Sequence, residues 1–453
     1  MTIDDLIARA EQDYPRVLAE LSELVTIPSV SNPAFDQAAV RVSAEAVAGL
    51  LRGAGMQDVR IAEATTDDGA VSRPAVLGHK AGPPGAPTVL LYAHHDVQPP
   101  GESAGWSTDD PFVPELRGDR LYGRGAADDK AGILAHVGAL RILGDDLPVN
   151  VTVFVEGEEE IGSPTFRSFL TQHRDALAAD VIVVADSSNW DVGTPALTTS
   201  LRGVVQVEVE VRVAHHAVHS GLFGGPSLDA VTSLARLIST LHDEDGEVAV
   251  DGLHVSDAEL VDYPEESFRT SSGMLDEVRL AGSGPLAARL WNKPAIAVIG
   301  LDATPVATSS NTLIPAARAA ISLRVAPGQD PAEAARALTD HLESRASLGA
   351  QVTTTVVESG PGFDGSGGGP ATEAAEWALA HAWGRRPVHQ GMGGSIPFIA
   401  DLKETFPHAQ ILVTGVEDPD SRAHSEDESL HVGEHARAVL AEALLLARLG
   451  GTL

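Results

Sequence analysis

The apolar positions follow two different patterns, which divide the chain near residue 201. Before that point, three short and nearly continuous apolar runs have the composition of strands buried on both faces: TVLLYAHHD (88–96), VNVTVFVEG (149–157) and DVIVVAD (180–186). A helical pattern lies between the first two runs, with an apolar face made by Ile133, Leu134, Val137 and Leu140. Strands that are separated by helices predict a mostly parallel α/β sheet.

After residue 201 the apolar residues alternate with polar ones. In GVVQVEVEVRVA every second position from Val205 to Val213 is valine, which predicts a strand with one face in solvent. ARAAISLRVAP and QVTTTVVES continue this pattern, and between them DPAEAARALTDHL opens with a helix-capping Asp330 and with Pro331 in the first turn. The middle of the chain, 201–360, is therefore predicted to be a separate α+β domain.

The first pattern returns after a glycine-rich stretch, GPGFDGSGGGP (360–370). We expect a flexible joint there, because the stretch lacks the Lys-Ser/Thr ending of a phosphate-binding loop. A helix, the apolar run QILVTG (410–415) and a terminal helix follow. The simplest organisation is one α/β domain, made of residues 1–200 and 361–453, that is interrupted by the inserted domain 201–360.

Charge and cysteine content limit the classes of function. The 453 residues include 31 Lys and Arg against 64 Asp and Glu, a formal charge of −33 that disfavours a nucleic-acid partner. The sequence contains no run of 18 apolar residues, so we expect no membrane span. The acidic start, MTIDDLIARAEQDYPRVL, predicts an amphipathic helix rather than a signal peptide. The absence of cysteine excludes disulfides, thiolate metal sites and cysteine nucleophiles. We expect a cytoplasmic protein.

Acidic residues and histidines gather where the predicted strands end. His94 and Asp96 end one strand, two glutamates follow another, Asp186 ends a third, and His424 comes shortly after the run 410–415. In open α/β sheets, ligands bind beyond the carboxyl ends of the strands. A single acidic residue at a strand end usually lies in a solvated turn. Acidic residues or histidines at four strand ends together indicate a metal site.

Residue spacing suggests how these groups divide the work. Residues i and i+2 of an extended segment point the same way, so Asp96 can accept a hydrogen bond from the imidazole nitrogen of His94 that faces away from the metal. Glu159 and Glu160 point in opposite directions, so one is expected to bind metal and the other to handle a water proton. Asp128, at a predicted helix start, is placed to bridge two cations.

Several motifs together resemble one family of enzymes, the carnosinase-like metallodipeptidases. This group belongs to the clan of aminoacylase, acetylornithine deacetylase and glutamate carboxypeptidase, and the resemblance spans about residues 90–430. The fold that it implies is a zinc-peptidase-like mixed sheet flanked by helices, with an inserted ferredoxin-like lid. The motifs, in family order, are YAHHDVQP, GRGAADDKAG, EGEEEIGS, VIVVAD, VHSGLFGG, SSNTLIP, GGSIP and RAHSEDE.

The resemblance implies a set of metal ligands. One metal ion would be held by His94 and Asp186, a second by Glu160 and His424, and Asp128 would bridge them. Three carboxylates and one hydroxide would then balance two divalent cations. Zinc is the expected metal, and manganese and cobalt are alternatives, because histidine and carboxylate ligands suit all three.

The resemblance also implies catalytic and substrate-binding roles. Glu159 would be the general base, Asp96 would orient the ligand imidazole, and His219 in the lid would stabilise the transition state, acting across subunits in dimeric members. We accordingly expect a homodimer through the lid domain. The positions that correspond to substrate-binding residues are Arg324, Asn311, Thr312, Gly394 and Ser395.

These inferences predict metal-dependent hydrolysis of dipeptides or short peptides. An N-acyl amino acid deacylase or a carboxypeptidase of the same clan is the alternative, although such relatives tend to carry Glu where this chain has Asp186. A binding protein that kept the fold without catalysis is a third hypothesis, disfavoured because all expected ligands and the base are present. One departure bears on substrate range: an acidic residue is expected before GGSIP in dipeptidases, and this chain has Met392.

Overall fold

The computed structural model describes residues 1–102, 105–256, 261–394 and 397–453. The chain forms two compact units, each described here by itself: unit 1 comprises 1–199, 367–390 and 401–453, and unit 2 comprises 200–366 and 391–400. The sequence predicts 391–400 with the α/β domain. Within unit 2, however, Arg202 donates from Nε to the carbonyl oxygen of Gly393 (3.1 Å) and from its backbone N–H to that of Met392 (3.3 Å).

Unit 1 is built on a mixed sheet with the strand order β1-β2-β6-β3-β7-β17-β8. The middle strands β6, β3, β7 and β17 are parallel, and the outer strands join antiparallel. The expected mixed α/β fold is confirmed. The strands are β1 (Gln57–Ala62), β2 (Ala75–Lys80), β3 (Thr88–His94), β6 (Asn150–Glu156), β7 (Val181–Val184), β8 (Ala196–Leu201) and β17 (Gln410–Val413), and β16 (Val388–Met392) pairs with β8. The last two residues of β8 belong to unit 2 and pair there with β15 (Phe363–Asp364).

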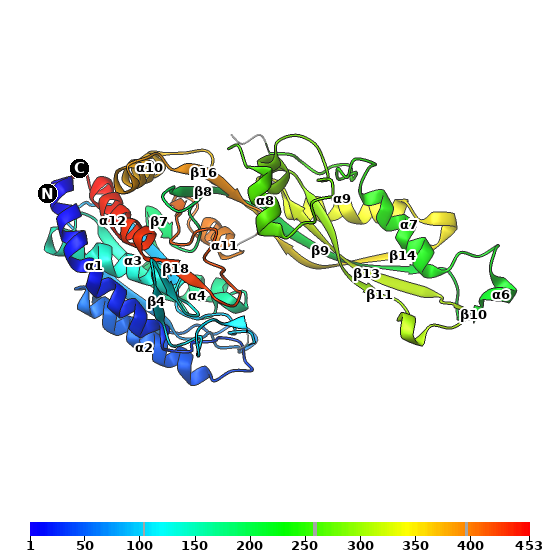
Figure 1. The fold of residues 1–453 in the computed structure, drawn as a ribbon, viewed down its shortest axis with the longest axis horizontal. Coiled ribbons are helices and arrows are strands. Elements are labelled where there is room, and N and C mark those ends of the chain that lie inside the picture. The colour runs from blue at the N-terminus through cyan, green and yellow to red at the C-terminus, as the bar shows by residue number, and fades with distance from the viewer. Residues whose placement is uncertain (103–104, 257–260, 395–396) are drawn as a thin grey trace. The chain divides into compact units, whose positions relative to one another are not determined.

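Helices flank this sheet because its strands are apolar on both faces. Val89, Leu91 and Ala93 of β3 join the main core cluster, while Tyr92 packs edge-on against Phe154 and Phe166. Helices α1, α3 and α12 pack against one another (Figure 1). The helices of this unit are α1 (Ile3–Val25), α2 (Gln37–Gly53), α3 (Lys130–Leu143), α4 (Phe166–Gln172), α5 (Arg174–Leu177), α10 (Pro370–Trp383) and α12 (Val432–Leu449), and α11 (Pro397–Thr405) spans the boundary with unit 2.

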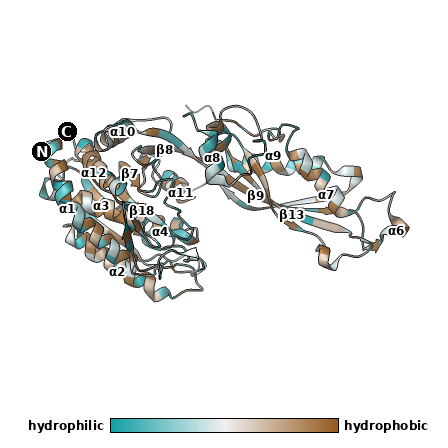
Figure 2. Cartoon of the chain, in the orientation of Figure 1, coloured by the Kyte–Doolittle hydropathy of each residue, from teal (hydrophilic) through white to brown (hydrophobic). Residues whose placement is uncertain are grey.

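The burial of the helices follows their composition. Every residue of α3 from Lys130 to Leu140 is buried, whereas α1 buries one stripe that includes Leu6, Val17 and Leu21. Figure 2 shows this contrast, since α3 is mainly hydrophobic and α1 carries both colours. β4 (Glu115–Arg117) and β5 (Arg120–Tyr122), which precede α3 in the chain, form a smaller antiparallel sheet with β18 (Ser429–His431), which precedes α12. Among the described residues, no helix is long and apolar enough to cross a membrane.

Unit 2 is an antiparallel four-stranded sheet with the order β11-β13-β9-β14. Its elements follow one another as β9 (Gly203–Arg212), α7 (Ala230–Ile238), β11 (Ala295–Asp302), β13 (Ala316–Val325), α9 (Pro331–Ser344) and β14 (Gln351–Gly360). This βαββαβ succession is that of ferredoxin-like folds. The valines of β9 pack under α7 and α9, and the polar residues between them face away from this core. Shorter elements are β10 (Val218–His219), α6 (Ser220–Phe223), α8 (Glu265–Ser272) and β12 (Thr312–Leu313).

Candidate metal centre

The carboxyl edge of the parallel strands in unit 1 collects the predicted ligands. His94 is the last residue of β3, and Asp186 lies two residues beyond the end of β7. Glu160 lies in a 3₁₀ turn just after β6, and Asp128 lies two residues before α3. His424 lies in the loop that follows β17. Parallel strands end at the same edge, so residues far apart in the sequence meet there.

Two groups of three side chains result, and they share one carboxylate. Nε2 of His94 lies 3.1 Å from Oδ1 of Asp128 and 4.0 Å from Oδ1 of Asp186. Nε2 of His424 lies 3.0 Å from Oδ2 of Asp128 and 3.1 Å from Oε2 of Glu160. Within each group the possible ligand atoms all lie within 4.8 Å of one another. Asp128 therefore turns one oxygen toward each histidine.

Burial and neighbouring charges shift the pKa values of this cluster. Burial, and then the nearby charge of Asp128, raises the pKa of Glu160 to about 7, and burial raises the pKa of Asp186 to about 6. Hydrogen bonds to Asp128 and then to Glu160 raise the pKa of His424 to about 11. Two imidazoles cannot balance this many buried carboxylates, whereas two divalent cations can. The donor set of imidazole nitrogen and carboxylate oxygen also fits such ions.

Asp96 connects the histidine to the glutamates. Nδ1 of His94 lies 3.0 Å from the backbone carbonyl oxygen of Asp96 and 3.5 Å from its carboxylate, so Nε2 is the nitrogen that faces the cluster. The carboxylate of Asp96 accepts hydrogen bonds from the backbone N–H groups of Glu159 (3.2 Å) and Glu160 (3.0 Å). Sequence spacing predicts that the His94 ring meets the Asp96 carboxylate, the pair at 3.5 Å, and it predicts neither the closer contact with the backbone carbonyl nor the bonds from the glutamate backbone. His95 lies apart, with its Nε2 2.8 Å from the carbonyl oxygen of Pro74.

The three adjacent glutamates have different surroundings. Glu158 turns away from the cluster and accepts hydrogen bonds from the backbone N–H groups of Arg73 and Thr165, both at 2.9 Å. Glu160 accepts from the backbone and side chain of Gln98 at 3.0 and 2.8 Å and also faces His424. Burial, and then the charge of Asp186, raises the pKa of Glu159 well above its usual value. A carboxyl group in that state is suited to exchanging protons.

The residues with predicted substrate roles that the structure describes lie in unit 2. His219 pairs with Thr312 across β10 and β12, and the carbonyl oxygen of Asn311 accepts from the N–H of Ser220 at 2.9 Å. His219, Asn311 and Thr312 are all exposed. Arg324 lies on the β13 face opposite the core, Gly394 is exposed, and Ser395 lies outside the described residues.

Sequence reasoning assigned no role to three residues that bear on these sites. Arg202 is buried, and burial and the charge of Arg324 lower its pKa to about 10. Burial, and then the nearby charges of Asp128 and Asp186, raises the pKa of Glu417 well above its usual value. Glu428 is fully buried beside the loop that carries Asp128. Only Glu428 left a signal in the sequence, because it ends the motif RAHSEDE.

The chain is similar over nearly its whole length to characterised proteins. It is 35% identical over 96% of each chain to a cysteinylglycine-S-conjugate dipeptidase of Corynebacterium striatum. It is 29% identical to the human beta-Ala-His dipeptidase, over 91% of this chain and 85% of that protein.

Solved structures share the fold. The dipeptidase Dug1p of Saccharomyces cerevisiae matches with a TM-score of 0.78 at 20% identity, over 99% of both chains. Human carnosine dipeptidase 1 matches with a TM-score of 0.77 at 23% identity, over 100% of this chain and 99% of that one. Residues 90–448 match the model of peptidase family M20/M25/M40. The chain therefore belongs to peptidase family M20/M25/M40.

Proposed function

We propose that this protein is a two-metal dipeptidase, which hydrolyses the peptide bond of dipeptides or short peptides. The observation that carries the proposal is the pair of three-residue groups that share Asp128, with Glu159 beside them. The relatives named above as dipeptidases support the substrate class. Asp186 also favours a dipeptidase, because acylases and carboxypeptidases of the clan tend to carry Glu at this position.

In this proposal His94 and Asp186 would hold one divalent ion, Glu160 and His424 would hold the other, and Asp128 would supply an oxygen to each. One solved structure that matches this chain is a dinuclear metal-binding peptidase of family M20 from Bacillus subtilis. When bound, such a pair of ions polarises the scissile carbonyl and lowers the pKa of water to about 7. Zinc is the expected metal, and manganese or cobalt would suit the same ligands.

The protein's own residues then position and move protons. Glu159 takes a proton from the attacking water and delivers it to the leaving amine, a task for which its raised pKa is suited. Asp96 holds the backbone of both glutamates and fixes the His94 ring, so these groups are oriented before substrate arrives. Such preorganisation limits the rearrangement that the reaction requires.

Unit 2 supplies the residues for substrate binding. His219 stabilises the oxyanion of the transition state, and Asn311 and Thr312, which the strand pairing holds beside it, bind the peptide. Arg324 binds the terminal carboxylate, and the like charge of buried Arg202 strengthens the local preference for an anion. Gly394 and Ser395 complete the proposed set.

A homodimer through unit 2 is part of the proposal. β11 is an edge strand of its sheet, and it exposes apolar side chains, with Ile299 and Leu301 each 56% exposed. An exposed apolar edge strand is a template for pairing with another chain. The mass of the protein in solution tests this, and a monomer at micromolar concentration would contradict it. The cytoplasmic location that the sequence suggests stays a prediction.

The decisive experiment compares matched substrates on enzyme reconstituted with Zn²⁺, Mn²⁺ or Co²⁺. We expect hydrolysis of dipeptides with a free amino group and much slower hydrolysis of their N-acetylated forms. The comparison matters because Met392 stands where an acidic residue is expected to face the amine. Faster turnover of the N-acetylated forms would instead establish the deacylase alternative. Tight binding without product release would establish a binding protein.

A further inference from the structure

The carboxylate of Glu428 holds the loop that presents Asp128. Its Oε1 accepts the backbone N–H groups of Ala127 (2.9 Å) and Asp128 (3.1 Å). Its Oε2 accepts the N–H of Gly125 (3.0 Å) and Nη1 of Arg124 (2.7 Å). Glu428 is fully buried, and Arg124 is 1% exposed. Four donors therefore converge on one carboxylate, and such charge-assisted hydrogen bonds are strong away from water.

The same glutamate ties this loop to the segment that carries His424. Glu428 lies four residues after His424, and its backbone carbonyl oxygen accepts the N–H of Gly123 at 3.1 Å. Nη2 of Arg124 donates to the carbonyl oxygen of Ser425 at 3.0 Å. Two segments about 300 residues apart are thus joined at the points where each supplies a predicted ligand.

The contacts of Asp128 make its placement critical. Each of its oxygens faces a different histidine, at 3.1 Å and 3.0 Å, so a rotation that improves one contact disturbs the other. A buried ion pair such as Arg124–Glu428 is weak evidence for stability, because desolvating both charges offsets much of their attraction. The chain buries this pair where it orients the shared carboxylate.

We propose that Glu428 is a positioning residue that, with Arg124, sets the place of Asp128 for both metal ions. This inference rests on the proposed two-metal function. It adds a role for a residue that does not touch the ions: groups that support metal ligands from behind usually contribute about 10–100-fold to metal affinity.

The test is Glu428→Gln, studied by equilibrium metal binding and by the visible absorption of the Co²⁺ form. Glutamine keeps the size, but its amide nitrogen cannot accept the hydrogen bonds that one carboxylate oxygen accepts. We expect affinity for both ions to fall about 10–100-fold and the Co²⁺ absorption to change, because Asp128 contacts both groups. Asp420→Asn, an exposed carboxylate in the loop that carries His424, should match the parent protein.

Both measurements are made without peptide, on protein that still unfolds cooperatively and well above the assay temperature. Parental affinity and parental Co²⁺ absorption in a folded Glu428→Gln variant would overturn the inference and leave the proposed function standing. If that variant does not fold, Glu428→Asp serves instead, since its shorter side chain withdraws the acceptor oxygens, and the same two outcomes apply. A parent protein that binds fewer than two ions would overturn both the inference and the proposed function.

Discussion

His136 and Glu442 form a buried histidine–carboxylate pair in the helical layer of unit 1, whereas the histidines of the candidate metal centre face several carboxylates at once. Nδ1 of His136 lies 2.8 Å from both oxygens of Glu442, and its Nε2 lies 3.0 Å from the carbonyl oxygen of Tyr92. Both ring nitrogens therefore have partners. In the metal centre, His94 and His424 share Asp128, and each also faces a further carboxylate.

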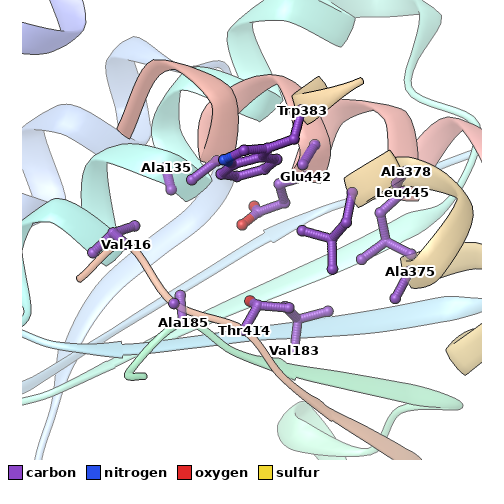
Figure 3. Close-up of a pocket in the computed structure, with 14 residues that line it drawn as sticks. Ala135, Val183, Ala185, Ala375, Ala378, Trp383, Thr414, Val416, Glu442 and Leu445 are labelled. Carbon is purple, nitrogen blue, oxygen red and sulfur yellow. The ribbon is translucent and has the colours of Figure 1, made fainter. Parts of the chain in front are cut away.

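The difference shows what separates a structural pair from a candidate metal site. At His136, one imidazole balances one carboxylate. Beside this pair lies a cavity of about 30 Å³, which is lined largely by small apolar residues such as Ala135 and Ala378 and also by Glu442 (Figure 3). The metal centre instead gathers more negative charge than its histidines can balance. Excess charge, rather than the contact of histidine with carboxylate, indicates the ion.

The largest expected difference is in metal content. Asp128→Asn removes a ligand shared by both groups, so we expect affinity for both ions to fall by more than about 100-fold, beyond the effect of changing a residue behind a ligand. Glu442→Gln should bind two ions like the parent protein. Metal analysis after dialysis at a fixed free-metal concentration measures this. Equal loss in the two variants would show that the comparison is mistaken.

A second prediction distinguishes Glu159 from its neighbour Glu158, which has different surroundings. Glu159→Gln should lower kcat by about 10²–10⁴-fold, the usual contribution of a general base, while two ions remain bound. Glu158→Gln should keep kcat within a few-fold, because its carboxylate is held by Thr165 and Arg73. Steady-state kinetics with metal analysis checks both variants. Near-parental turnover in Glu159→Gln would refute its role.

The structural pair should affect stability, and the effect should depend on pH. Burial alone lowers the pKa of His136, but the charge of Glu442 and its hydrogen bond raise it above the usual value. The pair's contribution is then fully present below about pH 6.5 and is lost as pH rises through the folded-state pKa. Glu442→Gln should cost about 1–3 kcal/mol at low pH and less at high pH. Denaturant unfolding of metal-free protein across this range measures it, and a constant difference would contradict the assignment.

The smallest expected effect is at the cavity beside Glu442. Ala378→Val adds two methyl groups to the cavity wall, worth about 0.8 kcal/mol each, against a helix-propensity cost of up to about 0.7 kcal/mol. We expect a net gain of about 0.5–1 kcal/mol in unfolding free energy. Ala380→Val, in the same helix but not in the cavity lining, should show only the cost. Equal changes in both variants would mean that the cavity does not accept the added groups.

Much of the fold and of the candidate site could be predicted from the sequence. The apolar runs that end at His94 and Asp186 correctly predict two buried strands and the points where they end. They can do so because hydrophobic period and composition are local properties of the chain. The mixed α/β fold is confirmed, and the resemblance to metallodipeptidases agrees with the family found by comparison. The structure also brings the five predicted ligands into the two groups that share Asp128.

Only the tertiary structure decided which groups hold the site in place. Asp96 supports the backbone of Glu159 and Glu160 as well as His94, and the loop of Asp128 depends on Glu428, about 300 residues further along. A local pattern records which face a residue occupies and where a strand ends. It cannot record hydrogen bonds between distant segments, because those partners meet only when the chain is folded.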